Sequence, residues 1–135
     1  MVLIVCVDDR NGMMFHKRRQ SQDRILRKRI LERAGGQRIW MSQDTAKQFE
    51  GEKQAVIRTD EHFFQKAGPG EFCFVEDPAF IEGDETIEKI ICYHWNRTYP
   101  GDVYFPIKLA SWKRIAWETF AGYSHEKITE EIYIR

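Results

Sequence analysis

Short apolar runs recur along the chain and are separated by more polar stretches. The first run, Val2–Val7, contains only valine, leucine, isoleucine and cysteine. A continuous apolar run of this length is typical of a strand that is buried on both faces of a sheet. Similar runs predict further strands at 38–41, 55–57, 72–75 and 87–95.

The polar stretches between these runs predict helices. Ser21 can cap a helix that continues to about Ala34, with Asp23 in its first turn, where a negative charge is favourable. Gly35 can end this helix in a left-handed conformation. Shorter helices or helical turns are predicted at 42–49, 60–66 and 77–81.

The end of the chain has a different pattern. Residues 112–117 and 127–134 alternate between apolar and polar side chains, as strands with one exposed face do. Gly122 and Ser124 lie between them and suit a hairpin connection. The whole pattern predicts an α/β fold over residues 1–135, as one domain: a mostly parallel central sheet, an antiparallel C-terminal edge hairpin and about three helices.

Composition limits the location and the chemistry. No apolar run approaches the ~20 residues that a membrane-spanning helix needs. The three cysteines lie far apart inside apolar runs, which predicts buried free thiols in a reducing compartment, the cytoplasm. Their spacing does not match a zinc site, so no metal is predicted.

The formal net charge is zero, but the charges are separated along the chain. Residues 10–38 contain ten Lys or Arg and two acids, whereas residues 50–88 contain eleven acids and three bases. This separation predicts a basic and an acidic face. The basic segment can bind phosphates or RNA, with Lys17, Arg18, Arg19 and Arg27 as candidate ligand-binding residues, or it can form only a solvated helix face. The basic face of one copy can also bind the acidic face of another, so a homo-oligomer is an alternative.

Five segments in this order resemble the dihydrofolate reductase family over nearly the whole chain. Besides the first strand and the closing hairpin, the similar segments are Trp40-Met41-Ser42-Gln43-Asp44-Thr45, Glu71-Phe72-Cys73-Phe74-Val75-Glu76-Asp77 and Gly101-Asp102-Val103-Tyr104-Phe105-Pro106. The resemblance implies the dihydrofolate-reductase-like fold, and in the family this fold binds NADPH and reduces a pterin-like substrate.

The chain departs from the family at the residues that hold the cofactor. The family has an arginine for the cofactor phosphate where this chain has Ser42 and Gln43, although Thr45 remains. The family has paired glycines that let the pyrophosphate approach the backbone, and here these positions are Glu76 and Asp77. Two carboxylates repel a pyrophosphate, so no cofactor is predicted and NADPH binding is disfavoured. Thr45, Glu76 and Asp77 are also candidate ligand-binding residues, and the acid pair can alternatively bind a metal, act as a general-acid pair or cap a helix.

Asp23 is the one residue placed to match the catalytic carboxylate of the family. It can act as a substrate-binding acid, or it can be an ordinary first-turn acid of a helix. His125 lies beside Ser124 and Glu126, and we interpret these three as turn residues of the final hairpin.

The start of the chain also resembles short bacterial proteins that begin Asp-Asp-Arg-Asn-Gly-Met and are sometimes labelled ribonuclease Z. That label implies a zinc hydrolase with a His-x-His-x-Asp-His cluster. The four histidines of this chain are His16, His62, His94 and His125, far apart in sequence, and they do not support it.

These observations leave three functional hypotheses. The first is a binding module, on a reductase scaffold with a degenerate cofactor site, for a small anionic ligand, nucleotide or RNA. The second is a divergent NADPH-dependent reductase with Asp23 as its acid. The third is an oligomeric interaction subunit whose charged faces associate.

Overall fold

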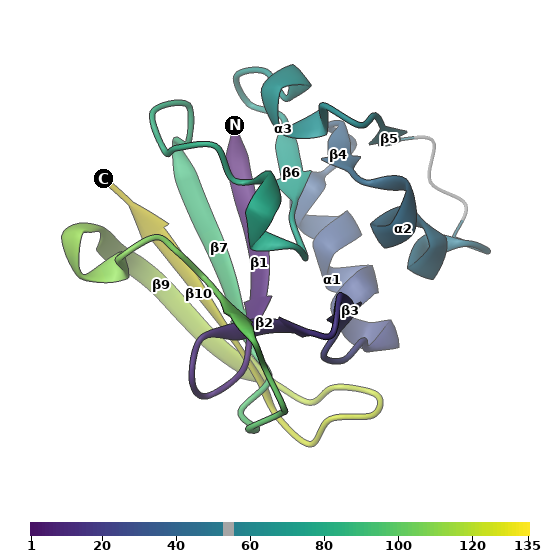
Figure 1. Cartoon of the computed structure of the whole chain (residues 1–135), viewed down its shortest axis with the longest axis vertical. Helices are drawn as coiled ribbons and strands as arrows, with labels where there is room; N and C mark the ends of the chain where they lie inside the picture. The colour runs from purple at the N-terminus through teal and green to yellow at the C-terminus, as the bar shows by residue number, and fades with distance from the viewer. Residues whose placement is uncertain (53–55) are drawn as a thin grey trace.

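The computed structural model describes residues 1–52 and 56–135, which form one seven-stranded sheet, one small sheet and the helices around them. The strand order of the large sheet is β5-β4-β6-β1-β7-β10-β9 (Figure 1). Its strands are β1 (Val2–Val7), β4 (Ile39–Met41), β5 (Ile57–Thr59), β6 (Phe72–Phe74), β7 (Lys89–His94), β9 (Lys113–Phe120) and β10 (Ile128–Ile134).

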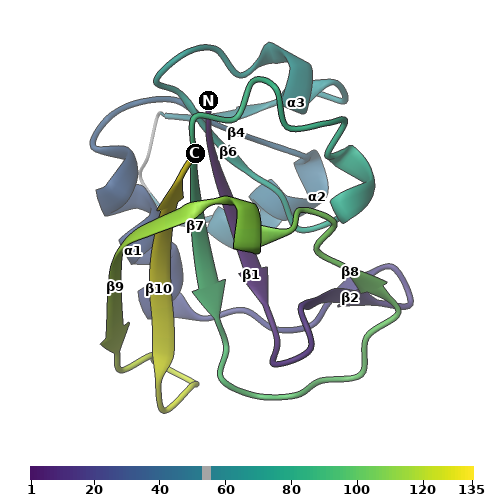
Figure 2. The ribbon, with the colours of Figure 1, turned by 90° about the vertical axis from the view of Figure 1, so that its left-hand side faces the viewer.

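The sheet is parallel from β5 to β7 and antiparallel at its other edge. β1 pairs in parallel with both β6 and β7, and β4 pairs in parallel with β5 and β6. β10 runs antiparallel to β7 and to β9, and these strands lie side by side in Figure 2. The predicted fold class is therefore confirmed. Residue 55, the start of the predicted strand 55–57, lies outside the described residues, and β5 begins at Ile57.

A second, three-stranded sheet was not predicted. It consists of β2 (Gly12–Phe15), β3 (Arg18–Arg19) and β8 (Val103–Tyr104), all antiparallel. His16 and Lys17 form the turn between β2 and β3 with φ angles of 48° and 62°, a left-handed conformation that matches the twist of a tight hairpin. This sheet lies at the carboxyl end of β1 (Figures 1 and 2).

Three α-helices are present in the described residues: α1 (Arg24–Ala34), α2 (Gln43–Ala46) and α3 (Phe63–Lys66). The predicted cap of α1 was wrong. Asp23, in an extended conformation, is the N-cap, and Ser21 lies outside the helix. Gly35 ends α1 in the left-handed conformation, as predicted. Short 3-10 helices are η1 (Lys47–Phe49), η2 (Pro78–Phe80) and η3 (Leu109–Ser111).

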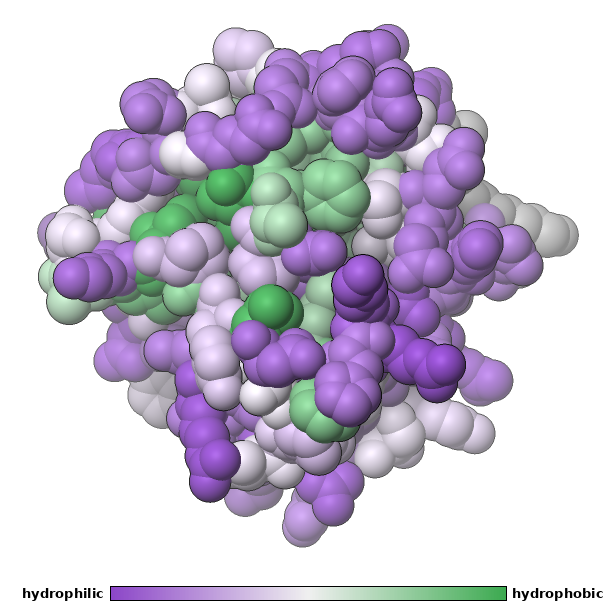
Figure 3. Space-filling view, in the orientation of Figure 1, coloured by the Kyte–Doolittle hydropathy of each residue, from purple (hydrophilic) through white to green (hydrophobic). Residues whose placement is uncertain are grey.

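The core lies in two layers, one on each face of the large sheet. Alternate residues of β1 point to opposite faces, so Ile4 packs with Leu26 and Ile30 of α1, whereas Val5 packs with Phe63 of α3. α1 lies behind the sheet in Figure 1 and η2 lies in front. Apolar residues gather across the middle of this front face in Figure 3, and hydrophilic residues surround them.

Two sequence predictions about cellular location rested on the lack of a membrane-spanning run and on free thiols. No helix in the described part of the chain has the length and apolar character needed to cross a bilayer. Cys6, Cys73 and Cys92 are free, and burial raises the pKa of each thiol. Such thiols are held in the protonated, unreactive form.

Candidate functional site

Asp23 joins the start of α1 to the loop between β9 and β10. Its side chain is buried, with 2% exposure. Oδ1 accepts the backbone N–H groups of Ile25 and Leu26, at 2.9 and 3.2 Å, which caps the helix. Oδ1 also accepts the N–H of Tyr123 at 3.0 Å, and Oδ2 accepts the N–H of Ser124 at 2.9 Å. One carboxylate thus fixes two segments a hundred residues apart.

His125 is the second member of this cluster and is also buried. Its Nδ1 lies 2.9 Å from Oδ2 of Asp23. Its Nε2 lies 2.8 Å from Oγ of Ser21 and 3.0 Å from the hydroxyl of Tyr99. The imidazole stacks on the Trp95 indole with ring centroids 4.5 Å apart. His125 lies in the loop of the final hairpin, as interpreted from the sequence, but its side-chain partners come from distant segments that no local pattern reveals.

The cluster keeps Asp23 ionised. Burial alone would raise the pKa of Asp23, but the N–H of Tyr123, the ring of His125 and the N–H groups of Ser124 and Leu26 all lower it. The net result is a pKa well below the usual range of aspartate. A carboxylate that stays ionised at neutral pH favours the His125 tautomer with its proton on Nδ1, and Nε2 is then an acceptor.

A glycine makes room for this cluster. A Cβ atom at Gly122 would lie 2.8 Å from Oδ2 of Asp23, 2.8 Å from the carbonyl oxygen of His125 and 3.0 Å from Cδ1 of Ile128. We expect Gly122→Ala to reduce the free energy of unfolding by about 1–3 kcal/mol, because the carboxylate and the loop must move apart. Chemical denaturation would measure this, and a change within about 0.5 kcal/mol would show that the loop yields freely.

Asp8 organises the neighbouring loops at the carboxyl end of β1. It is 2% exposed and accepts the N–H groups of Gly12, Arg10 and Tyr99, at 2.7, 2.9 and 3.1 Å, and the Gln20 amide at 3.2 Å. Burial would raise the pKa of Asp8, but these hydrogen bonds lower it. The contact with Tyr99 helps to place the phenol against His125.

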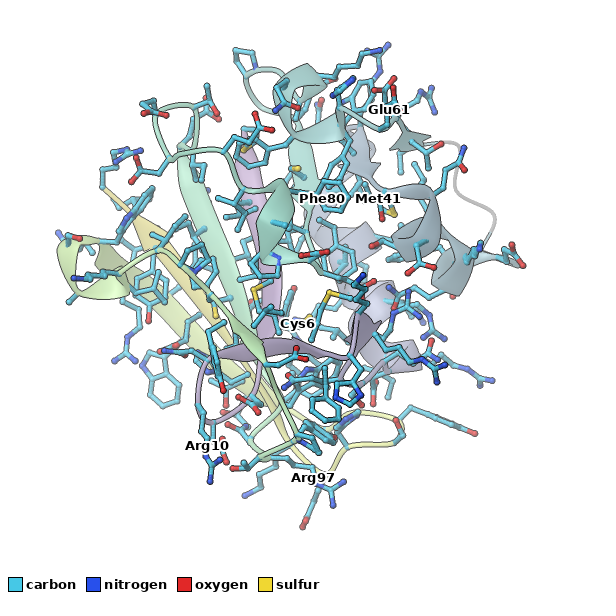
Figure 4. The ribbon with its side chains drawn as sticks, in the orientation of Figure 1. Cys6, Arg10, Met41, Glu61, Phe80 and Arg97 are labelled. Atoms are coloured by element: carbon cyan, nitrogen blue, oxygen red, sulfur yellow. The ribbon has the colours of Figure 1, made fainter. Side chains whose placement is uncertain are left out.

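The crevice between the carboxyl ends of β1 and β6 is filled by side chains. Arg19 donates from Nε to both carboxylate oxygens of Glu76, at 3.1 and 2.9 Å, and from Nη2 to the Asp44 carbonyl at 3.1 Å. The cavity that remains is about 10 Å³, and Cys6, labelled near the centre of Figure 4, is on its wall. Its lining is Cys6, Met13, Arg19, Gln20, Ser21, Glu76 and Trp95.

A larger groove of about 540 Å³ lies where β4 and β5 end. Ser42, Gln43, Thr59, Asp60, Glu61 and Phe80 line it. Glu61 and Phe80 are labelled in Figure 4. Its lining contains two acids and no base, and Asp60 is paired with Lys66 at 2.7 Å. Thr45 does not line it, because it is buried and bonded to Ser42.

Exposed cations gather beyond the carboxyl ends of β1 and β7. A polar groove of about 600 Å³ there is lined by Trp95, Asn96, Arg97, Ser124, Glu126 and Lys127. Arg10 and Arg97 both lie at this lower end in Figure 4, and the N–H of Asp9 bonds the Arg97 carbonyl at 2.9 Å. Lys17 and Arg18 are exposed on the β2–β3 hairpin.

Some of the predicted basic residues are exposed, and others form ion pairs with acids of the same chain. Arg19 is paired with Glu76, and Arg29 and Arg33 are paired with the buried Glu130. Arg27 lies half-buried on α1. The basic face is therefore smaller than the sequence count predicts.

The two acids at the end of β6 have separate partners. Glu76 binds Arg19, whereas Asp77 caps η2 by accepting the N–H of Ala79 at 2.9 Å. Within residues 1–52 and 56–135, no group of three or more His, Cys, Asp or Glu side chains comes together in an arrangement that could hold a metal ion.

Comparisons with known proteins identify the fold. No family model matches this chain, and no curated protein matches it. Among solved structures, the chain is similar to dihydrofolate reductase from Enterococcus faecalis complexed with NADP(H) and RAB-propyl. The TM-score is 0.70 at 11% sequence identity, and the match covers 99% of this chain and 95% of that chain. The fold is dihydrofolate-reductase-like, as predicted, and the low identity fits a divergent sequence.

The residues of this chain do not fit NADPH. A phosphate in the groove at β4 and β5 would face Asp60 and Glu61, with no arginine or lysine among the lining residues. η2, which follows β6, is a single turn of three residues, so it offers little helix dipole for a pyrophosphate. The Arg19–Glu76 pair leaves about 10 Å³ between β1 and β6, far less than a nicotinamide ring occupies.

Proposed function

We propose that this protein is a cytoplasmic binding module for a small anionic ligand, such as a nucleotide, on a dihydrofolate-reductase-like scaffold that works without NADPH. The observation that carries the proposal is the 600 Å³ groove lined by Arg97 and Lys127. It lies at the carboxyl ends of the parallel strands, where open α/β sheets commonly bind ligands.

The chemistry of this groove suits an anion. Arg97 and Lys127 supply two cations against one acid, Glu126, and Asn96 and Ser124 supply neutral hydrogen-bonding groups. Neither cation has an ion-pair partner in the described part of the chain, so neither needs to leave a carboxylate when a ligand binds. A guanidinium can bind phosphate oxygens with two parallel hydrogen bonds.

RNA is a longer ligand that can bind at the same end of the molecule. Arg10, Lys17 and Arg18 are exposed and also have no ion-pair partner among the described residues. A strand that leaves the groove could contact them through its phosphates. A steep loss of affinity with added salt distinguishes this mode from a single phosphate group, because each phosphate contact releases a counterion.

A divergent reductase is disfavoured by the same geometry. It requires NADPH near Asp23, but the Asp23 carboxylate is taken up by its helix cap, two loop N–H groups and His125. An acid with all these partners has little capacity left to bind a pterin-like ring.

A thermal-shift titration tests the proposal. We expect a nucleoside monophosphate or inorganic phosphate to stabilise the protein by about 2.7 kcal/mol at a hundredfold excess over its Kd, and NADPH to give no shift beyond that of its phosphate groups. The double variant Arg97→Ala, Lys127→Ala should lose the shift, whereas the control Lys108→Ala, Lys113→Ala should keep it. Stabilisation by micromolar NADPH that survives the first double variant would overturn the proposal and favour a reductase.

A further inference from the structure

We propose that Ser21 is an activated nucleophile and that Ser21, His125 and Asp23 form an acyl-transfer site for small carboxylic esters. This activity goes beyond anion binding. Its three reacting residues do not line the anion groove, although Trp95 and Ser124 border both sites. The proposal rests on the hydrogen-bonded order of the three side chains and on the partial exposure of Ser21.

The three groups have the spacing that nucleophilic catalysis by serine requires. Oγ of Ser21 lies 2.8 Å from Nε2 of His125, and Nδ1 of the same ring lies 2.9 Å from Oδ2 of Asp23. In a serine triad the base contacts the hydroxyl through one nitrogen and the carboxylate through the other. Such triads are recognised by geometry, because their order along the chain differs between folds.

The carboxylate and the ring are rigidly held. Asp23 accepts the N–H groups of Tyr123 and Ser124 as well as the ring, so its orientation does not depend on His125 alone. The stacking of His125 on Trp95 fixes the plane of the imidazole. With the proton on Nδ1, the lone pair of Nε2 faces the hydroxyl of Ser21 and can take its proton.

Tyr99 competes with Ser21 for the same nitrogen. Its hydroxyl lies 3.0 Å from Nε2, slightly farther than Oγ of Ser21. Since Nε2 has one lone pair in this tautomer, each donor weakens the other. Removal of the phenolic hydroxyl should therefore strengthen the contact between Ser21 and His125.

Ser21 also borders the small cavity at the crevice between β1 and β6. A volume of about 10 Å³ has room for one atom the size of a water oxygen, such as a carbonyl oxygen. Arg19 lines the same cavity, and its Nη1 has no hydrogen-bond partner in the described part of the chain. We assign the guanidinium of Arg19, which lines the cavity beside its partner Glu76, to stabilise the negative oxygen that forms during attack. The rest of the ester must lie in solvent, which limits the site to small esters.

The proposed reaction consumes water and balances without a cofactor. Oγ of Ser21 attacks the ester carbonyl as its proton passes to Nε2, and the C–O bond breaks as that proton passes to the leaving alcohol. Water then attacks the acyl-serine with His125 as base, which releases the carboxylic acid and restores the hydroxyl.

A fluorophosphonate probe tests the assignment on the full-length protein. The probe transfers its phosphonyl group to an activated serine and releases fluoride, and peptide mass spectrometry identifies the modified residue. We expect the adduct on Ser21, its loss in Ser21→Ala, a labelling rate at least about a hundredfold lower in His125→Gln, and a higher rate in Tyr99→Phe. Ser111→Ala, which removes an exposed serine of η3, is the matched control and should label like the parent.

Three results would overturn the proposal. They are no adduct under conditions that label a known serine esterase, an adduct on another serine, and equal labelling of Ser21 in the parent and a folded His125→Gln variant. If His125→Gln does not fold, the location of the adduct and the rate in Tyr99→Phe still decide the question. None of these results depends on Arg97 or Lys127, so failure here is separate from failure of the anion-binding proposal.

Discussion

A Glu130→Ala variant is expected to lose about 3 kcal/mol of its free energy of unfolding. Glu130 is 2% exposed and lies on β10 beneath α1. Its Oε2 accepts from Nε of Arg29 at 3.2 Å, Nε of Arg33 at 3.0 Å and the hydroxyl of Tyr93 at 2.8 Å. Removal of the carboxylate leaves Arg33 and the buried hydroxyl of Tyr93 without this acceptor, and leaves Arg29 with Glu118 alone. The arginines keep some contact with water, which places the loss at the lower end for a broken buried pair.

Thermal denaturation would show this loss as a fall of roughly 10 °C in Tm for a chain of this length. Glu118→Ala is the matched control, because Glu118 also pairs with Arg29 but its side chain is 56% exposed. Exposed pairs contribute about 0–1 kcal/mol, so the control should stay close to the parent. Equal losses in both variants would mean that the contact with Arg29, rather than burial of Glu130, determines the stability.

The same cluster shows why charge counts along the sequence overestimate the basic face. Arg29 and Arg33 are four residues apart, so they lie on one side of α1. The sequence shows that spacing but not which strand lies beneath it. Glu130 is about a hundred residues away, and its position opposite the helix depends on the register between β10 and β7. Two of the ten cations counted in the sequence are thus paired with Glu130, a contact that no local pattern reveals.

The large elements of the fold could be predicted because burial imposes a pattern on them. β1 and β7 lie in the middle of the sheet and are covered on both faces, so their sequences are almost continuously apolar. The small sheet could not be predicted in this way. β3 and β8 have two residues each, too few to show an alternation. β3 pairs locally with β2, but β8 pairs with β2 from about 90 positions away.

The candidate site was only partly visible in the sequence. Asp23 stood out as an acid at the start of a helix, and the resemblance to the reductase family also singled it out. His125 did not, because its Asp23 partner is 102 positions away. The one local signal was Gly122 before Ser124 and His125, which marks a place where the backbone approaches another group closely. The sequence alone does not identify the Asp23 carboxylate as the group that lies against Gly122.

The second large effect is expected for Asp23→Asn, which should reduce the free energy of unfolding at pH 7 by about 2–3 kcal/mol. Asparagine is as good a helix cap as aspartate, so Oδ1 can still accept from Ile25 and Leu26. The amide group that replaces Oδ2 cannot accept the N–H of Ser124 or share a proton with His125 as a carboxylate does. Asp77→Asn is the matched control, because Asp77 caps η2 through a single bond to Ala79, and it should change stability by a few tenths of a kcal/mol.

The pH dependence separates this charge from simple loss of packing. The pKa of Asp23 is lowered in the folded protein, so the unfolded chain takes up a proton first as the pH falls. The stabilisation from Asp23 is fully present above the unfolded aspartate pKa of about 3.9 and is lost as the pH falls below it toward the lower folded value. Between pH 6 and pH 3, the parent should therefore lose more stability than Asp23→Asn, and the difference between their unfolding free energies should shrink. Parallel curves for the two proteins over this range would mean that the Asp23 carboxylate contributes through its shape and not through its charge.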